Sequence, residues 1–221
     1  TINEVANGMF GSEIPLGILP GGTANLCVRE LKIPLRVADA IDVIAKGKTR
    51  AISVGQANGR YFLLMVGIGF DSAVIKGVDP DLKRRFGKLA FSLSALQTAR
   101  RYGYPCFRVR IDQQERECVF AVVSNAREYG AYFVLTPDAD ISDEYFRVCL
   151  FKEPGFWNTT KYVWHALWRA HTNLPSVEIL QAKELEILGP EGVAVQADGD
   201  VIGFLPMKFK IHPRSLSVFC S

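Results

Sequence analysis

The sequence predicts an α+β protein, in which a partial α/β lobe precedes a larger antiparallel β-sandwich domain. Up to about residue 48, helical segments alternate with a short apolar run, as they do in βαβ layers. Beyond residue 50, short runs of alternating apolar residues are separated by turn signals, a pattern typical of antiparallel sheets. We therefore place a domain boundary near residue 50 and divide the chain into 1–50 and 51–221.

The first lobe contains helical periodicity and one candidate strand. Residues 1–9 have a helical period, and the apolar run 13–19 predicts a buried parallel strand. A helix is predicted over 24–31, and another over 35–45, which ends before Gly47. Because a parallel sheet needs several strands, this lobe is only part of an α/β layer.

The second domain is predicted from hairpin and strand signals. Asn58-Gly59 is a strong hairpin signal, and it joins predicted strands at 49–56 and 60–67. Helices are predicted at 83–102 and 156–171. The other predicted strands cover 106–111, 117–124, 146–151, 176–188, 193–197 and 208–219.

Composition limits the class of protein and its partners. With 221 residues, 48% of them hydrophobic, the chain can bury a substantial core. The net charge of +3 is too small to indicate a nucleic-acid partner, and it is compatible with an anionic substrate or membrane surface. Five cysteines without a Cys-x-x-Cys spacing predict reduced thiols in a cytoplasmic protein. The longest apolar run, 61–70, is too short for a transmembrane segment.

A candidate phosphate loop lies at 20–25, with the sequence Pro-Gly-Gly-Thr-Ala-Asn. Such an entry into a helix exposes backbone N–H groups at the positive end of the helix dipole, which favours phosphate. It is neither a Walker loop nor a dinucleotide fingerprint. The alternative is an ordinary turn whose glycines supply positive φ angles.

A second candidate site is the tripeptide Asp198-Gly199-Asp200, which follows the predicted strand 193–197. Carboxylates two positions apart in an extended segment project to the same side. Such a pair can hold Mg²⁺, or one member can act as a base. The alternative is a surface hairpin turn, in which Asp-Gly is favoured for backbone reasons.

An acidic loop at 136–146 gathers four carboxylates before a predicted strand. Oxygen-rich loops of this kind can bind a hard cation through carboxylates and backbone carbonyls. The alternative is a solvated turn.

Basic residues follow two acids at the start of the predicted helix 83–102 and include Arg84 and Arg85. These side chains are candidates for contact with phosphate. The alternative is a solvated helix face.

An aromatic stripe falls on one face of the predicted helix 156–171 and contains Trp157, Trp164 and Trp168. Such a stripe is more often core packing, which we expect here. If it were exposed, it would indicate contact with lipid or a membrane.

These motifs, in this order, resemble those of the diacylglycerol kinase and sphingosine kinase family of lipid kinases. Residues 1–8 resemble the end of the family's Gly-Gly-Asp-Gly-Thr loop and the Asn-Glu-Val-x-Asn-Gly helix that follows it. Residues 20–25 match Pro-x-Gly-Thr-x-Asn, 69–71 match Gly-Phe-Asp, and 198–200 stand in place of Asp-Gly-Glu. The loop 137–146 matches the family's structural magnesium site.

The resemblance implies an NAD kinase-like first lobe and transfer of the ATP γ-phosphoryl group to a lipid hydroxyl, with Mg²⁺. Diacylglycerol or a sphingoid base would be the acceptor. In this family pattern Asp200 would be the general base, and Asp198 would help to hold Mg²⁺. The residues implied to contact the nucleotide are Thr1, Asn3, Gly21, Gly22, Thr23 and Arg84.

The resemblance also implies a structural metal site and an acceptor residue. The Asp143 carboxylate and the backbone carbonyls of Asp140 and Tyr145 would bind the structural Mg²⁺. Asp71 would lie at the acceptor site. The lipid would be met at a membrane surface, so we expect a cytoplasmic protein that binds membranes peripherally; the oligomeric state is left open between monomer and homodimer.

The chain departs from the family pattern at several points. Leu26 and Ser53 stand where many bacterial relatives have aspartates, and Asp200 is one methylene shorter than the family's glutamate. The Gly-Gly-Asp-Gly residues would precede Thr1, so we expect an N-terminally truncated kinase that lacks part of its phosphate cradle. Two alternatives stay open: an NAD kinase-like enzyme, and a non-catalytic lipid-binding or regulatory module.

Overall fold

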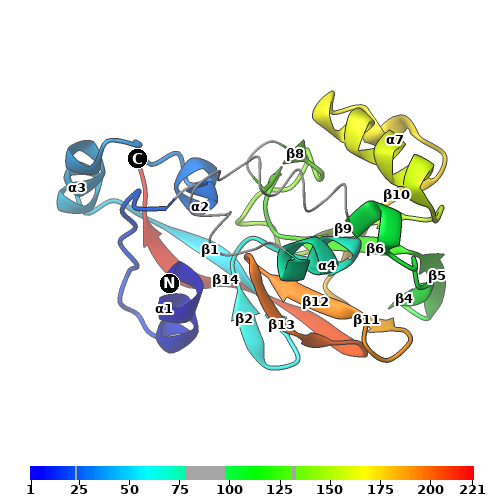
Figure 1. The fold of residues 1–221 in the computed structure, drawn as a ribbon. Helices are drawn as coiled ribbons and strands as arrows, with labels where there is room; N and C mark the ends of the chain where they lie inside the picture. The colour runs from blue at the N-terminus through cyan, green and yellow to red at the C-terminus, as the bar shows by residue number, and fades with distance from the viewer. Residues whose placement is uncertain (23, 78–97, 131–132) are drawn as a thin grey trace.

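The computed structural model describes every residue except 23, 78–97 and 131–132 (Figure 1). Its described part is an α+β fold with two six-stranded sheets, in which all strand pairs are antiparallel. The first sheet has the order β2 (Arg60–Phe62), β1 (Thr49–Ala57), β14 (Met207–Phe219), β11 (Glu184–Leu188), β4 (Phe107–Ile111) and β5 (Gln114–Cys118). The second has the order β10 (Val177–Ala182), β9 (Phe146–Phe151), β6 (Phe120–Ser124), β3 (Met65–Gly69), β12 (Ala194–Ala197) and β13 (Asp200–Phe204). The predicted fold class is confirmed.

Helices lie at the two ends of this sandwich and, in the case of α4, near its middle (Figure 1). At the end that contains both chain termini are α1 (Ile2–Met9), α2 (Leu26–Glu30) and α3 (Val37–Ala45). Elsewhere are α4 (Phe70–Gly77), α7 (Phe156–Leu167), the short 3₁₀ helix η1 (His171–Asn173) and a small hairpin of β7 (Glu128–Tyr129) and β8 (Phe133–Val134). No helix in the described ranges is long and apolar enough to cross a membrane.

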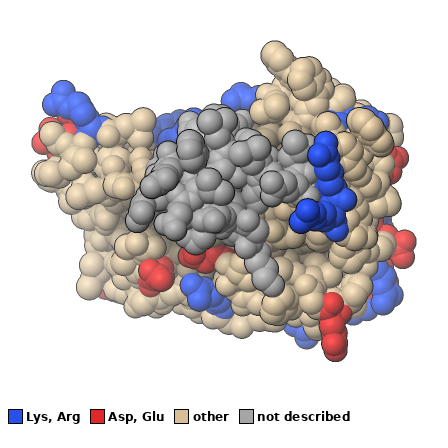
Figure 2. All heavy atoms as spheres, in the orientation of Figure 1, with Lys and Arg blue, Asp and Glu red and all other residues tan. Residues whose placement is uncertain are grey.

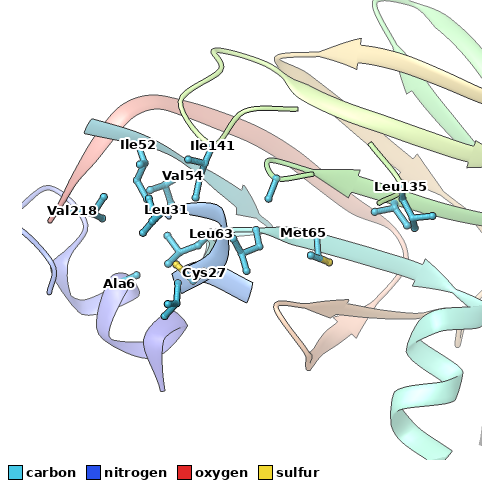
Figure 3. Packing of buried hydrophobic residues seen from close by; sticks show 14 of the residues in the cluster. Ala6, Cys27, Leu31, Ile52, Val54, Leu63, Met65, Leu135, Ile141 and Val218 are labelled. Carbon is cyan, nitrogen blue, oxygen red and sulfur yellow. The ribbon is translucent and has the colours of Figure 1, made fainter. Parts of the chain in front are cut away.

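The core divides into two clusters. One fills the space between the sheets and includes Phe62 and Phe209 from the first sheet and Phe146 from the second. The other packs α1 and α2 against the ends of β1 and β14, through residues such as Ala6 and Cys27 (Figure 3). Successive side chains of a strand point to opposite faces of its sheet, so every second residue of these strands faces the space between the sheets and joins the first cluster.

Strand β14 contributes residues to both clusters. An irregularity in its pairing with β1 explains why its two halves face different clusters. Ile52 pairs with Leu216 but Val54 pairs with His212, so β14 has extra residues at this point, where Arg214 has a φ of 49°. Such a bulge bends a strand and redirects its side chains. Phe209 therefore faces the space between the sheets, while Leu216 packs with the N-terminal helices.

Most predicted strands are confirmed, but three of them are wrong as single strands. Residues 60–67 contain β2 and the start of β3, separated by Leu63 and Leu64. Residues 117–124 contain the end of β5 and all of β6, and Val119 lies between them. Residues 176–188 contain β10 and β11, separated by Lys183. In each case the chain crosses from one sheet to the other. The sequence pattern continues through each crossing, so it does not mark the change of sheet. Strand β13 was not predicted.

The first lobe differs from expectation in two elements. The run 13–19 forms only an isolated parallel bridge between Leu16 and Val218, so it is not a regular strand. The helix predicted over 24–31 is limited to α2 and begins after Asn25. Of the predicted helix 83–102, residues 98–101 are helical and 83–97 lie outside the described residues. The domain boundary near residue 50 stays a prediction.

Candidate functional site

The Asp198-Gly199 pair forms the two-residue turn of the β12–β13 hairpin. Ala197 pairs with Asp200, and the two turn residues have φ angles of 49° and 98°. Two positive φ angles suit the right-handed twist of a tight hairpin. The alternative of a hairpin turn is thus confirmed. The turn geometry alone does not say what the Asp198 and Asp200 carboxylates do.

The Asp198 carboxylate binds the segment where the chain passes from β2 to β3. Its Oδ1 accepts the N–H groups of Leu64 at 2.9 Å and Met65 at 3.0 Å. Its Oδ2 accepts the Leu63 N–H at 2.7 Å and the Asn3 Nδ2–H at 2.8 Å. Hydrogen bonds to an ionised carboxylate are stronger than neutral ones, and these four occupy both oxygens. Asp198 therefore anchors the turn to the rest of the molecule.

Two asparagines of α1 complete this anchor. Asn3 is buried, with 8% exposure, and it also donates to the Tyr61 carbonyl at 3.1 Å. Asn7 accepts the Tyr61 N–H at 2.9 Å and donates to the Tyr61 carbonyl at 2.8 Å, so its amide pairs with the free edge of β2. The sequence analysis did not single out Asn7 or Tyr61. Asn7 could have been found from its spacing to Asn3, since residues four apart lie on the same helix face. The sequence contains no comparable signal for Tyr61.

Asp200 is exposed at the first position of β13, an edge strand. Among the described residues its carboxylate has no hydrogen bond or ion pair. Val201 and Phe204 of the same strand are 43% and 51% exposed. The turn thus holds one aspartate inward and leaves the other accessible.

The candidate phosphate loop is open at Gly21, whereas a side chain at Gly22 would come within 3.1 Å of the Asn25 Oδ1. A side chain at Gly21 would meet nothing within 4 Å, and neither Gly21 nor Gly22 has a positive φ. The alternative that these glycines serve a left-handed turn is therefore wrong. The Gly22 N–H donates to the Asn25 Oδ1 at 2.8 Å, and Asn25 itself has a φ of 50°. Thr23 lies outside the described residues.

Helix α2, which follows this loop, lies close to the anchored turn. Cys27 of α2 packs in the same cluster as Leu63, whose N–H binds Asp198 (Figure 3). Burial, and then the negative charges of Asp198 and Glu30, raise the pKa of Cys27 to about 12. The thiol is therefore protonated at neutral pH and is not a nucleophile.

The acidic loop 136–146 is docked on β1. Ala139 and Ile141 are buried, and the Ile141 carbonyl accepts the Ser53 N–H at 2.8 Å. The Arg50 guanidinium binds the Asp140 carboxylate and donates to the Ser142 Oγ at 2.8 Å. The loop is therefore docked through its backbone and apolar residues, while the side chains of Asp138, Asp140 and Glu144 stay exposed, so the alternative of a solvated turn stays open.

Asp143 lies in this loop with part of its carboxylate available. Its N–H donates to the Asp140 carbonyl at 2.8 Å, and its Oδ2 accepts the Asp140 N–H at 3.2 Å. No described residue donates to its other oxygen. Carboxylate and carbonyl oxygens suit a hard cation such as Mg²⁺. Within the described ranges no three His, Cys, Asp or Glu side chains cluster, so a cation here would depend on one carboxylate and on carbonyls.

The other predicted site residues are scattered or outside the description. Thr1 is exposed, and its α-amino group lies 3.3 Å from Glu4. The Arg147 guanidinium lies over the Tyr145 ring, 4.9 Å from its centre. Asp71 is in α4, but its side chain is outside the description, as is Arg84. Ser53, which replaces a family aspartate, is fully buried, and its Oγ accepts the Arg214 N–H at 3.1 Å.

The architecture of this sandwich matches a known class of domain. A family model described as the YegS C-terminal NAD kinase beta sandwich-like domain matches residues 64–220. The diacylglycerol kinase catalytic domain model matches residues 1–57. The chain belongs to the family of this YegS C-terminal domain, and the resemblance to diacylglycerol kinases stated from its motifs is confirmed.

Individual relatives agree with this placement. The chain is 28% identical over 214 residues to a diacylglycerol kinase of Bacillus subtilis, covering 95% of this chain and 71% of that one. It is 25% identical over 226 residues to an uncharacterized protein of Synechocystis, covering 99% of this chain and 52% of that one. The crystal structure of a diacylglycerol kinase from Bacillus anthracis is similar, with a TM-score of 0.80, 26% identity, and coverage of 100% and 74%. At the level of the family, these findings support a lipid kinase.

Proposed function

We propose that this protein transfers the γ-phosphoryl group of ATP to the hydroxyl group of a lipid, with Asp200 as the general base. The observation that carries the proposal is the anchored turn. Four N–H donors hold Asp198, one of them from Asn3, which the resemblance assigns to the nucleotide site. This arrangement keeps the accessible Asp200 close to the start of the chain.

In the proposed reaction the acceptor hydroxyl oxygen attacks the γ-phosphorus as the bond to the ADP oxygen breaks. The hydroxyl proton passes to the Asp200 carboxylate, which releases it to solvent because the side chain is exposed. An alcohol needs such a base within hydrogen-bond reach, and a base of this kind contributes about 10²- to 10⁴-fold to the rate. The exposed Val201, next to Asp200, and Phe204, at the other end of β13, provide apolar surface for the lipid chain.

We assign Asp198 to positioning, in place of the Mg²⁺-binding role that the resemblance implied. Both its oxygens already accept two hydrogen bonds each, so a cation would have to displace backbone donors. Mg²⁺ in such enzymes is bound largely by substrate phosphates and water, with one or two carboxylates. Asn3 and Asn7 support the same anchor from α1.

We assign the nucleotide and the structural Mg²⁺ to separate sites. The open surface at Gly21, together with Gly22 and Thr23, would receive the phosphates, with Thr1 and Arg84 as further contacts. The Asp143 carboxylate and the Asp140 and Tyr145 carbonyls would hold a structural Mg²⁺ and keep the acidic loop on β1. Bound Mg²⁺ supplies neutralisation of phosphate charge. Turnover would take place at a cytoplasmic membrane surface.

Phosphate transfer from labelled ATP to diacylglycerol, ceramide, sphingosine and NAD tests this proposal. The assay uses the 221-residue chain and a longer version in which the family's Gly-Gly-Asp-Gly loop precedes Thr1. We expect label on a lipid, and we expect Asp200→Asn to lower turnover at least about 10²-fold without changing the unfolding temperature. Asp112→Asn is the matched control. Asp112 is an exposed aspartate in the turn between β4 and β5, outside the proposed site, so this variant should retain turnover.

Three results contradict parts of this proposal. If Asp200→Asn turns over at the normal rate, Asp200 is not the general base. Label on NAD alone identifies an NAD kinase-like enzyme. If no acceptor is labelled while lipid is still bound, the protein is a non-catalytic lipid-binding module.

A further inference from the structure

Helix α7 carries all three tryptophans of the chain at its surface. Trp157, Trp164 and Trp168 are 81%, 60% and 71% exposed, and Trp168 is the residue that caps the helix. Leu167 beside them is also exposed. The prediction that this stripe packs in the core is therefore wrong. Soluble proteins seldom expose a contiguous group of large apolar side chains unless it binds something.

The opposite face of α7 is fixed to the sandwich. Tyr162 and Ala166 are buried, and the Tyr162 ring packs edge-on against Phe151 at 4.9 Å. The Tyr162 hydroxyl accepts the Glu153 N–H at 3.1 Å. At about 100° per residue, the three tryptophans lie within roughly 40° of one another, on the side away from Tyr162 and Ala166. The helix therefore presents the tryptophans outward from a firm base.

The charged side chains within α7 and the turn after it are all basic, and the nearest acid in the sequence is the exposed Glu153, which precedes the helix. Residues 155–173 contain no Asp or Glu, whereas Lys161 and Arg169 are both exposed. Lys161 lies between Trp157 and Trp164 along the helix axis and at the edge of the stripe, about 40° around the helix from Trp157. Arg100 adds a further cation, with its guanidinium 5.7 Å from the centre of the Phe156 ring. In Figure 2 the surface over α7, at the upper right, is largely uncharged, and Lys and Arg side chains lie beside it.

We propose that this face of α7 docks the protein on an anionic lipid bilayer, with the tryptophans in the interface and Lys161 and Arg169 toward the headgroups. Tryptophan is suited to this position because its ring is apolar and its N–H is polar. Basic residues beside an apolar helix face add attraction to anionic lipids. This inference rests on the proposed lipid kinase function and names the surface by which it meets its substrate.

Intrinsic fluorescence tests the proposal without any substitution, because every tryptophan of the chain is on this face. The 221-residue chain is mixed with phosphatidylcholine vesicles, with and without phosphatidylglycerol. We expect a blue shift of the emission with the anionic vesicles and quenching by lipids brominated on the acyl chains. Unchanged emission and no quenching would overturn the proposal.

Co-sedimentation with the same vesicles measures the contribution of each part. The triple variant W157S/W164S/W168S should bind at least about tenfold more weakly, and K161E/R169E should lose the preference for anionic lipid. The matched control is I14S/L35S/I41S, which removes three exposed apolar side chains from the first lobe and should bind normally. Equal loss in both triple variants would overturn the assignment to α7.

Two further measurements separate this inference from the proposed function. If α7 docks on membranes, the tryptophan variant of an active enzyme loses turnover on vesicle-borne lipid but retains it on a water-soluble, short-chain acceptor. A chain that binds vesicles through α7 but phosphorylates no lipid contradicts the kinase proposal alone. If the chain is a dimer that the tryptophan substitutions dissociate, and it does not bind vesicles, a second copy occupies this face and the inference is wrong.

Discussion

Two hairpin turns of this protein have the same backbone form and different uses. In each, both turn residues have positive φ angles: 49° and 98° at Asp198 and Gly199, 46° and 66° at Asp112 and Gln113. The Asp198 carboxylate accepts four N–H donors from distant segments, whereas no described residue donates to the Asp112 carboxylate, which is exposed. Backbone geometry alone therefore does not distinguish a candidate site from an ordinary turn. The inward side chain does.

The largest expected difference between the turns is in stability. Asp198→Ala should lower the free energy of unfolding by about 3 kcal/mol, because three backbone N–H groups and Asn3 lose their charged acceptor. Asp112→Ala should change it by less than about 0.5 kcal/mol. Denaturant unfolding of both variants measures this. Equal effects at the two turns would show that the hydrogen bonds of Asp198 contribute nothing specific.

A smaller effect is expected from the asparagine that supports the anchored turn. Asn7→Ala should cost about 2 kcal/mol of unfolding free energy, because the Tyr61 N–H loses its acceptor and the Tyr61 carbonyl keeps only the longer of its two side-chain hydrogen bonds, from Asn3. Asn158→Ala is the control, since Asn158 donates only to the Pro154 carbonyl on the surface of α7. A loss no greater than that of the control would mean that α1 is not held to β2 by this amide.

The smallest effect concerns a buried polar group away from both turns. His171 is fully buried, its Nε2 lies 2.9 Å from the Leu135 carbonyl, and burial lowers its pKa below the ordinary value. The unfolded chain then binds a proton more readily than the folded one, so stability falls as pH decreases through about 6.5 and toward the folded pKa. His171→Gln should reduce this dependence strongly, and His165→Gln only slightly, because the charge of His165 is a minor cause of the lowered pKa of His171. Thermal unfolding at several pH values measures it, and an identical pH dependence in both variants would contradict the argument.

Local signals in the sequence predicted much of the fold. Asn58-Gly59 marked the first hairpin, and the stripe of Trp157, Trp164 and Trp168 marked a helix. The crossings at Leu63–Leu64, Val119 and Lys183 were missed, because the apolar pattern continues through a change of sheet. Exposure of the tryptophan stripe was missed too, since periodicity shows that a face is apolar and not whether anything covers it.

The candidate site shows the same division between local and distant information. The motif around Asp198 and Asp200 was visible in the sequence. The inward direction of Asp198 was not, because its partners Asn3 and Leu63 are 195 and 135 positions away. Asn7 was overlooked for a related reason. Its partner is the backbone of Tyr61, and a backbone group is present at every position whatever the residue type.

The central claim is that one aspartate of the turn holds the structure while its neighbour carries the chemistry. The most direct test measures lipid phosphorylation and unfolding temperature together for Asp200→Asn in the version that carries the upstream phosphate loop. The account predicts an unfolding temperature equal to that of the unsubstituted protein and turnover reduced at least about 10²-fold. Full turnover in that variant, with the same fold, would contradict it.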